Sequence, residues 1–312
     1  MKRSSVASVT VILLGLTLPA TFAGDDFPVL KGPYIGQPPP GATPQIFAPG
    51  IVSTDGDQVN GVFAPDGKEF YFSSFHPGSG YTIMVMRETA AGWSRPRVAP
   101  FSGEYSDVDM FITHDGGRLF FISKRPLRQG GPRPPGYQIW VTERESAAWG
   151  APSHLGPVVN SGTRQLYPTA ARNGTLYFNS DRGGYGRGDF FRSRWIDGGY
   201  SEPQNLGEAI NSEYDETDIL VAPDESYVVF TSVDRPDGLG NGDLYLSFRT
   251  EDGDWTRARN MGEAINTTSS EFCPMLSPDG RYFFFTSRRR GDDDIYWVDA
   301  AIIDRYRPAF IK

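Results

Sequence analysis

Short apolar and aromatic runs recur along the chain at a nearly constant spacing, and each follows a polar turn. These runs occupy residues 70–73, 119–123, 176–180, 228–232 and 283–287, and each ends in Ser. The turn residues lie 49, 58, 51 and 55 positions apart and are Asp66, Asp115, Asn173, Asp224 and Asp279. Aromatic and β-branched residues suit strands, and Asp-Gly or Asn-Gly suits a tight turn between strands. A period near fifty built of short strands is typical of a β-propeller with one four-stranded blade per repeat.

The rest of each repeat fits such a blade. A polar loop follows the Ser, and a third strand is predicted at residues 81–85, 137–141, 189–191, 243–247 and 294–298. In the first four repeats an aromatic residue then marks the start of a predicted fourth strand. These residues are Trp93, Trp149, Tyr200 and Trp255. The fifth repeat has no counterpart, because the chain ends soon after Val298.

The missing strand is present at the other end of the chain. Residues 44–53 match residues 203–212, which hold the fourth strand of the third repeat, without a gap. The N-terminal segment is therefore expected to supply the outer strand of the last blade, which closes the ring and removes an open sheet edge. The sequence predicts an all-β fold, a five-bladed β-propeller whose last blade is closed by the N-terminal strand.

The chain start is predicted to lie outside this fold. Lys2 and Arg3 precede an apolar run from Val9 to Leu18, and small residues follow, so residues 1–23 read as a secretory signal peptide. The run is short for a transmembrane helix, and the alternative is an uncut membrane anchor. We expect a periplasmic or secreted protein without a membrane span after cleavage. Residues 24–43 are a Pro- and Gly-rich lead-in, and residues 44–312 form the propeller.

The net charge and the cysteine count limit the classes of partner and of chemistry that the protein is expected to have. The formal net charge is -8 and becomes -10 without residues 1–23, because that segment contains Lys2 and Arg3 but no acid. No basic stripe is visible, which argues against a nucleic-acid partner. The single cysteine, Cys273, excludes an intrachain disulfide, and its apolar strand favours a buried structural thiol over a nucleophile.

The repeat resembles a known family. Ser277-Pro278-Asp279-Gly280, an aromatic strand, Ser287 and an Arg- and Gly-containing loop are similar to the WD40-like (PD40) propeller repeat of TolB. The likeness extends over roughly residues 44–298 and implies the fold. TolB has six blades and a separate N-terminal domain, whereas this chain has five repeats and little sequence before the first, so the cell-envelope role of TolB is not carried over.

Polar residues recur at the start of each predicted inner strand. The first polar set lies eight positions before each turn residue and is Gln58, Asp107, Gln165, Glu216 and Glu271. The second polar set lies six before and is Asn60, Asp109, Tyr167, Asp218 and Cys273. The inner strand of a blade runs along the central channel. We therefore expect an acidic channel mouth on the top face, with the Asp-Gly turns on the opposite, bottom face.

The loops on the top face carry Arg125, Arg182, Arg235 and Arg289. Arg suits forked recognition of carboxylates, phosphates or sugar hydroxyls. The simpler interpretation is that these arginines pair with the acids of neighbouring blades. The candidate ligand-binding set at the channel mouth is Asp107, Asp109, Gln165, Glu216, Asp218, Glu271, Arg125, Arg182, Arg235 and Arg289.

The sequence favours binding over catalysis. It has no Gly-x-Ser-x-Gly motif, and its three histidines are scattered, so a serine hydrolase or a zinc site is not expected. We predict a monomeric, non-enzymatic binding module for a protein partner or a glycan, without a cofactor. The alternative is a glycan-active hydrolase or lyase that uses paired carboxylates at the mouth. A partner docking on the outer strands stays open. A Ca²⁺ ion at the mouth or in residues 292–294 is a weaker option, because such acid runs are more often solvated surface.

Overall fold

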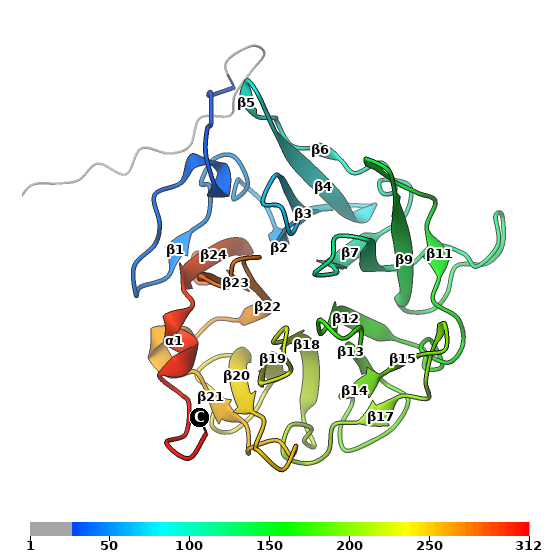
Figure 1. Ribbon diagram of the computed structural model, residues 1–312, viewed down its shortest axis with the longest axis vertical. Helices are drawn as coiled ribbons and strands as arrows, with labels where there is room; N and C mark the ends of the chain where they lie inside the picture. The colour runs from blue at the N-terminus through cyan, green and yellow to red at the C-terminus, as the bar shows by residue number, and fades with distance from the viewer. Residues whose placement is uncertain (1–26, 312) are drawn as a thin grey trace, which may run out of the picture.

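The computed structural model describes residues 27–311, so the predicted signal peptide lies outside the described residues. Antiparallel sheets form a closed ring around a central channel, and the predicted five-bladed β-propeller is confirmed (Figure 1). The strands that line the channel are β2 (Gln58–Phe63), β7 (Asp107–Ile112), β12 (Gln165–Ala170), β18 (Asp215–Val221) and β22 (Glu271–Leu276).

Each inner strand pairs with a second strand, and that strand pairs with a third. The second strands are the predicted apolar runs: β3 (Glu69–His76), β8 (Arg118–Ser123), β13 (Leu176–Ser180), β19 (Tyr227–Val233) and β23 (Tyr282–Ser287). The third strands are β4 (Gly80–Thr89), β9 (Gln138–Glu145), β14 (Asp189–Ser193), β20 (Gly242–Phe248) and β24 (Asp294–Asp299). In the fourth turn Glu225 adopts the left-handed conformation, with φ 61°, that Gly67 and Gly280 adopt in theirs.

The outer strands are only two residues long. They are β5 (Gly92–Trp93) and β6 (Arg97–Val98), β10 (Ala148–Trp149) and β11 (Ser153–His154), β17 (Gln204–Asn205), and β21 (Arg259–Asn260). A small hairpin of β15 (Trp195–Ile196) and β16 (Gly199–Tyr200) decorates the third blade. The predicted closure is confirmed, because β1 (Gln45–Ile46) pairs with β24, with Gln45 opposite Trp297 and Ile46 opposite Tyr296.

Aromatic packing fastens this closure. Phe47 follows β1 and is fully buried. Its ring meets those of Phe63, Phe284 and Trp297 edge-on, at centroid distances of 5.9, 5.2 and 5.1 Å. Edge-to-face contacts of this kind stabilise beyond the area that they bury. The first and last blades are therefore joined by side chains that lie more than two hundred positions apart in the sequence.

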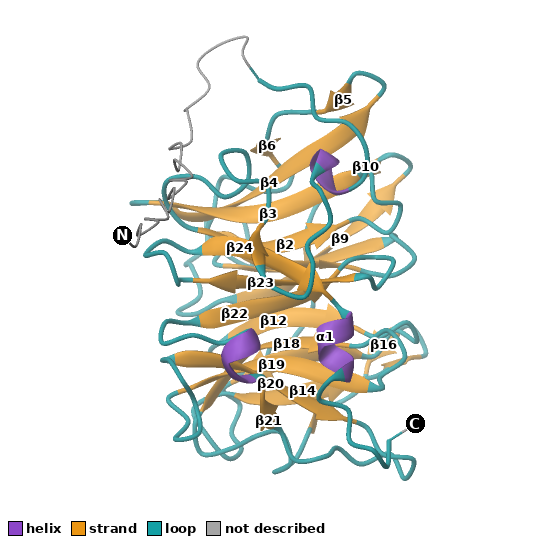
Figure 2. Cartoon of the chain, turned by 90° about the vertical axis from the view of Figure 1, so that its left-hand side faces the viewer, coloured by secondary structure: helices purple, strands orange, loops and turns teal. Residues whose placement is uncertain are grey.

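Both described ends of the chain lie against the bottom face. In the lead-in, which contains η1 (Tyr34–Gly36), the Tyr34 ring packs edge-on against Phe63 and Tyr282. At the other end, α1 (Ala301–Asp304) buries Ile302 and Ile303. In the side view α1 lies toward the right, the side that faces the viewer in Figure 1 (Figure 2). A second short helix is η2 (Gly262–Ala264). Within residues 27–311 no helix has the length and apolar character needed to cross a bilayer.

Candidate functional site

The first polar set is buried and, apart from the unpartnered Gln165 Oε1, bonded within the protein. Asp107, Gln165, Glu216 and Glu271 have no exposed surface. The three carboxylates accept hydrogen bonds from the link that precedes their own strand. Ser102 Oγ donates to Asp107 at 2.8 Å, Ser212 N–H to Glu216 at 3.1 Å, and Thr267 N–H to Glu271 at 2.7 Å. In this structure these side chains tie the links between blades to the inner strands, and they have no surface with which to meet a ligand.

The top-face arginines are also engaged. Arg125 binds Asp107 at 2.9 Å, and Arg289 reaches Glu271 at 3.4 Å. Each also donates to a carbonyl of the preceding link, as does Arg182. Arg235 pairs with Asp237 at 3.3 Å and lies over the Tyr245 ring.

Two of the top-face arginines therefore pair with acids of the first polar set. The expected pairing was between neighbouring blades, and in both cases the two partners lie in the same blade. Asp107 and Arg125 belong to one blade, and so do Glu271 and Arg289. The reason is the Ser that ends each second strand. Arg125 Nε and Arg289 Nε donate to the hydroxyls of Ser123 and Ser287, which turns both guanidinium groups back over their own blade.

The second polar set lies where the inner strands are irregular. The pairing of each inner strand with its neighbour shifts at this point. Asn60, Asp109, Tyr167 and Cys273 all have left-handed backbones there, with φ between 47° and 56°. Such conformations are unfavourable for residues with side chains and are maintained by the surrounding structure.

Side chains of this set meet across the channel. Asn60 Nδ2 donates to the Tyr167 hydroxyl at 3.0 Å, and that hydroxyl donates to the Pro274 carbonyl at 2.9 Å. Burial raises the pKa of the Cys273 thiol well above its usual value, so the thiol stays protonated. Burial also raises the pKa of Asp218, to about 6, and burial with repulsion from Asp218 raises the pKa of Asp109.

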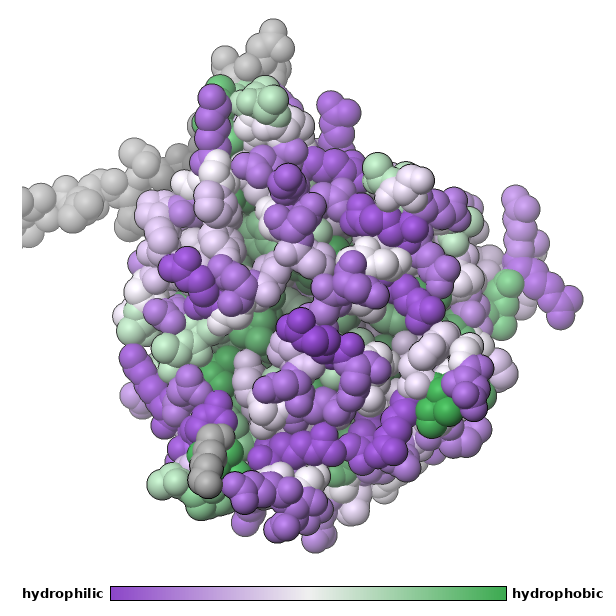
Figure 3. Space-filling view, in the orientation of Figure 1, coloured by the Kyte–Doolittle hydropathy of each residue, from purple (hydrophilic) through white to green (hydrophobic). Residues whose placement is uncertain are grey.

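A cavity lies at the other end of the channel, on the bottom face. It measures about 960 Å³ and extends inward from the Asp-Gly turns. Apolar colour is visible inside the central hollow, with hydrophilic residues around it (Figure 3). The apolar lining includes Phe111, Leu220, Met275, Leu276 and Ile303. The sequence does not predict this site, because its Asp-Gly turns are equally consistent with plain connections between strands.

One turn position rings this bottom-face cavity. The second residue of each of the five turns lines it, and these residues are Pro65, His114, Arg172, Pro223 and Pro278. Two of them, His114 and Arg172, break the proline pattern and lie on adjacent blades. The departure from the repeat was the signal in the sequence that would have pointed to this face.

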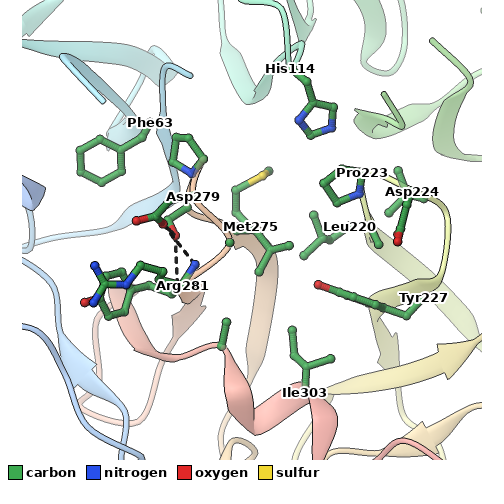
Figure 4. Close-up of a pocket in the computed structure, with 18 of the residues that line it drawn as sticks. Phe63, His114, Leu220, Pro223, Asp224, Tyr227, Met275, Asp279, Arg281 and Ile303 are labelled. Carbon is green, nitrogen blue, oxygen red and sulfur yellow. Dashed lines mark hydrogen bonds between the residues drawn. The ribbon is translucent and has the colours of Figure 1, made fainter. Parts of the chain in front are cut away.

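The cavity combines apolar and polar groups. His114, Tyr227, Met275 and Ile303 point into the common space from different sides (Figure 4). His114 Nε2 lies 3.1 Å from the Ala170 carbonyl, and burial lowers the pKa of His114. Burial raises the pKa of Tyr227, so its hydroxyl remains a neutral donor. Because its pKa is lowered, the His114 imidazole is uncharged at neutral pH.

The aspartates of the turns at the cavity rim already accept hydrogen bonds within the protein. Asp224 accepts from the Ser226 N–H at 3.0 Å, and Asp279 accepts from the Arg281 N–H at 3.1 Å (Figure 4). Asp304 binds Arg307 at 2.8 Å. These carboxylates therefore stabilise the turns and the tail. The arrangement offers a recess lined by both apolar and polar groups, as in ligand pockets.

Comparison with known proteins supports the fold. No family model and no curated protein matches the sequence. Among solved structures, TolB from Acinetobacter baumannii is 13% identical with a TM-score of 0.50, over 80% of this chain and 53% of that one. A glycoside hydrolase is 10% identical with a TM-score of 0.50, over 78% of this chain and 87% of that one. The chain thus spans about half the length of the TolB structure, and at these identities the likeness shows the fold alone. The protein is a β-propeller with a TolB-like fold.

Proposed function

We propose that the protein is an exported, non-enzymatic binding module whose main ligand site is the bottom-face cavity. The observation that carries this proposal is the ring of turn residues around a recess of about 960 Å³ that has apolar side chains in its wall. A recess of this kind receives an apolar side chain, while the backbone beside that side chain meets polar groups at the edge. The ligand class that fits is an extended segment of a protein partner that carries a large apolar residue.

The cavity wall supports this choice. Leu220, Met275 and Ile303 supply apolar surface, and the neutral Tyr227 hydroxyl and the exposed Arg172 supply donors for backbone carbonyls. Burying one Leu- or Phe-sized side chain contributes about 1.5–3 kcal/mol, and hydrogen bonds at the edge add to this. Such contacts support a dissociation constant nearer the millimolar than the micromolar scale for a short segment, since 1 mM corresponds to about 4 kcal/mol and 1 μM to about 8 kcal/mol.

The enzymatic alternative has less support. A glycosidase needs two carboxylates on either side of a sugar. Asp107, Glu216 and Glu271 are fully buried and bonded. Asp109 and Asp218 have only 9% and 8% of their surface exposed, so neither presents an open carboxylate to a sugar.

The test is a selection from a random peptide display library against the purified protein. Ala301 is exposed and lines the cavity, so Ala301→Trp narrows the entrance without filling the core. Ala147→Trp, in the β9–β10 turn of an outer hairpin, is the matched control. We expect peptides with an aromatic or Leu residue that lose at least tenfold in affinity toward Ala301→Trp and keep it toward Ala147→Trp.

Two results would count against this function. Peptides that bind both tryptophan variants equally well would move the site away from the cavity. Turnover of an oligosaccharide from a polysaccharide panel, abolished by Asp218→Asn, would favour the hydrolase alternative.

A further inference from the structure

The top-face end of the channel contains two buried carboxylates that lack a cation. Asp218 accepts from the Cys273 N–H at 3.1 Å and from the Thr231 hydroxyl at 3.4 Å. Asp109 has one hydrogen bond, a long one of 3.9 Å from the Cys273 thiol. Both aspartates are more than nine-tenths buried, and neither takes part in an ion pair in the described part of the chain. Buried carboxylates are normally paired or fully hydrogen-bonded.

The repeat register explains why Asp109 has so few partners. In the first blade the equivalent side chain, Asn60, accepts the N–H of Met110 in the next blade at 2.8 Å. By the same register Asp109 would accept the N–H of residue 168, which is Pro168 and has no N–H. One oxygen of the Asp109 carboxylate is therefore left without a donor, inside the channel.

The surroundings suit a positive charge. Tyr81, Tyr137 and Tyr167 lie close enough to Asp109 that its charge raises the pKa of each hydroxyl, together with burial. The arginines near this end already have partners: Arg288 binds Asp293 at 2.8 Å, and Arg164 binds Asp215 at 3.0 Å. Lys124 Nζ lies 4.7 Å from the centre of the Tyr137 ring, and within residues 27–311 it forms no ion pair with Asp109 or Asp218. Aromatic side chains therefore stand beside two carboxylates that have no cation partner of their own.

A small pocket leads from the top face to Asp218. It measures about 220 Å³, and its lining includes Thr217, Asp218, Thr231, Asn241, Phe272 and Arg288. The pocket has room for several non-hydrogen atoms, since one water in the liquid takes up about 30 Å³. The charge of Arg288 is balanced there, because its Nε and one terminal nitrogen donate to the Asp293 carboxylate at 2.9 and 2.8 Å.

We propose that this end of the channel binds an organic cation, a primary ammonium or guanidinium group, with Asp218 and Asp109 as its counter-ions. The two carboxylates supply acceptors, and Tyr81 and Tyr167 supply aromatic rings beside them. In the described part of the chain no three His, Cys, Asp or Glu side chains are placed to hold a metal ion together. An ammonium or guanidinium group needs fewer acidic ligands, because its own N–H groups form the hydrogen bonds.

Isothermal titration of the purified protein at pH 8 tests this. The ligands are butylammonium and butylguanidinium, with butanol as the neutral control and CaCl₂ as the metal control. We expect both organic cations to bind, because each can donate hydrogen bonds to the two carboxylates. Asp218→Asn and Asp109→Asn are each expected to weaken binding about tenfold or more. Asp304→Asn, an exposed acid at the opposite face, leaves it unchanged.

Further ligands identify the source of the cation and separate this site from the cavity. Spermidine represents a free polyamine. Nα-acetyl-lysine amide, whose side-chain ammonium is free, represents a lysine of a protein partner. Ala301→Trp is expected to leave binding of either one unchanged. Both aspartate variants remove buried negative charge, so they are expected to fold, and urea denaturation verifies this. Equal binding of butanol, binding of Ca²⁺ alone, or full affinity in Asp109→Asn and Asp218→Asn would overturn the proposal.

Discussion

Replacing Asp218 by Asn is expected to stabilise the protein at alkaline pH. Burial raises the pKa of Asp218 from 3.8 to about 6, and the nearby Asp109 opposes a second negative charge. Between pH 4 and 6 the folded state holds a proton that the unfolded state has lost. The free energy of unfolding therefore falls as pH rises through this window. A shift of about two pKa units corresponds to about 3 kcal/mol of lost stability above pH 7.

The asparagine variant avoids most of this loss. Its amide oxygen still accepts from the Cys273 N–H, the bond that measures 3.1 Å in the wild-type structure. Urea denaturation at pH 5 and pH 8 measures the effect. The wild type should be more stable at pH 5, and Asp218→Asn should exceed the wild type at pH 8 by about 1–3 kcal/mol. A variant that is less stable than the wild type at pH 8, with an unchanged pH slope, would refute the argument.

Three further predictions concern the closure of the ring, a buried ion pair and the buried thiol. Phe47→Ala should lower the free energy of unfolding by about 3–5 kcal/mol, whereas Phe310→Ala, at a side chain that is 72% exposed, should change it little. Arg125→Met leaves the buried Asp107 unpaired and should cost about 3–5 kcal/mol, and adding Asp107→Asn should recover much of it in urea denaturation. The buried Cys273 thiol should resist an aromatic disulfide reagent until urea unfolds the protein; rapid labelling under native conditions would contradict its burial.

The fold was predictable because it repeats. The turns and the aromatic strands occur five times, so a single ambiguous segment did not decide the assignment. The match between residues 44–53 and 203–212 also located the closing strand, which pairs with Trp297 and Tyr296 as expected. Local sequence fixes such elements, because a strand between two turn signals has few other ways to bury its apolar face.

The site was harder to predict, because polarity alone does not show which side chains are exposed. Glu216 and Glu271 are acidic and recur at the same position of the repeat. Both are nevertheless buried and accept hydrogen bonds from Ser212 and Thr267. The cavity depends instead on the depth of the apolar wall below the turns and on the position of α1, and both arise only when the ring closes. The departure from the repeat at His114 was visible in the sequence, but its place on a cavity rim was not.

Site-specific photo-crosslinking of the best selected peptide tests the central claim most directly. A benzophenone amino acid placed at Arg281, an exposed long side chain that lines the cavity, reports on the cavity entrance, and the same group at Ala147 reports on an outer hairpin. The account predicts crosslinking from position 281, competed by free peptide, and none from position 147. Crosslinking from 147 with none from 281, at peptide concentrations that saturate binding, would contradict it.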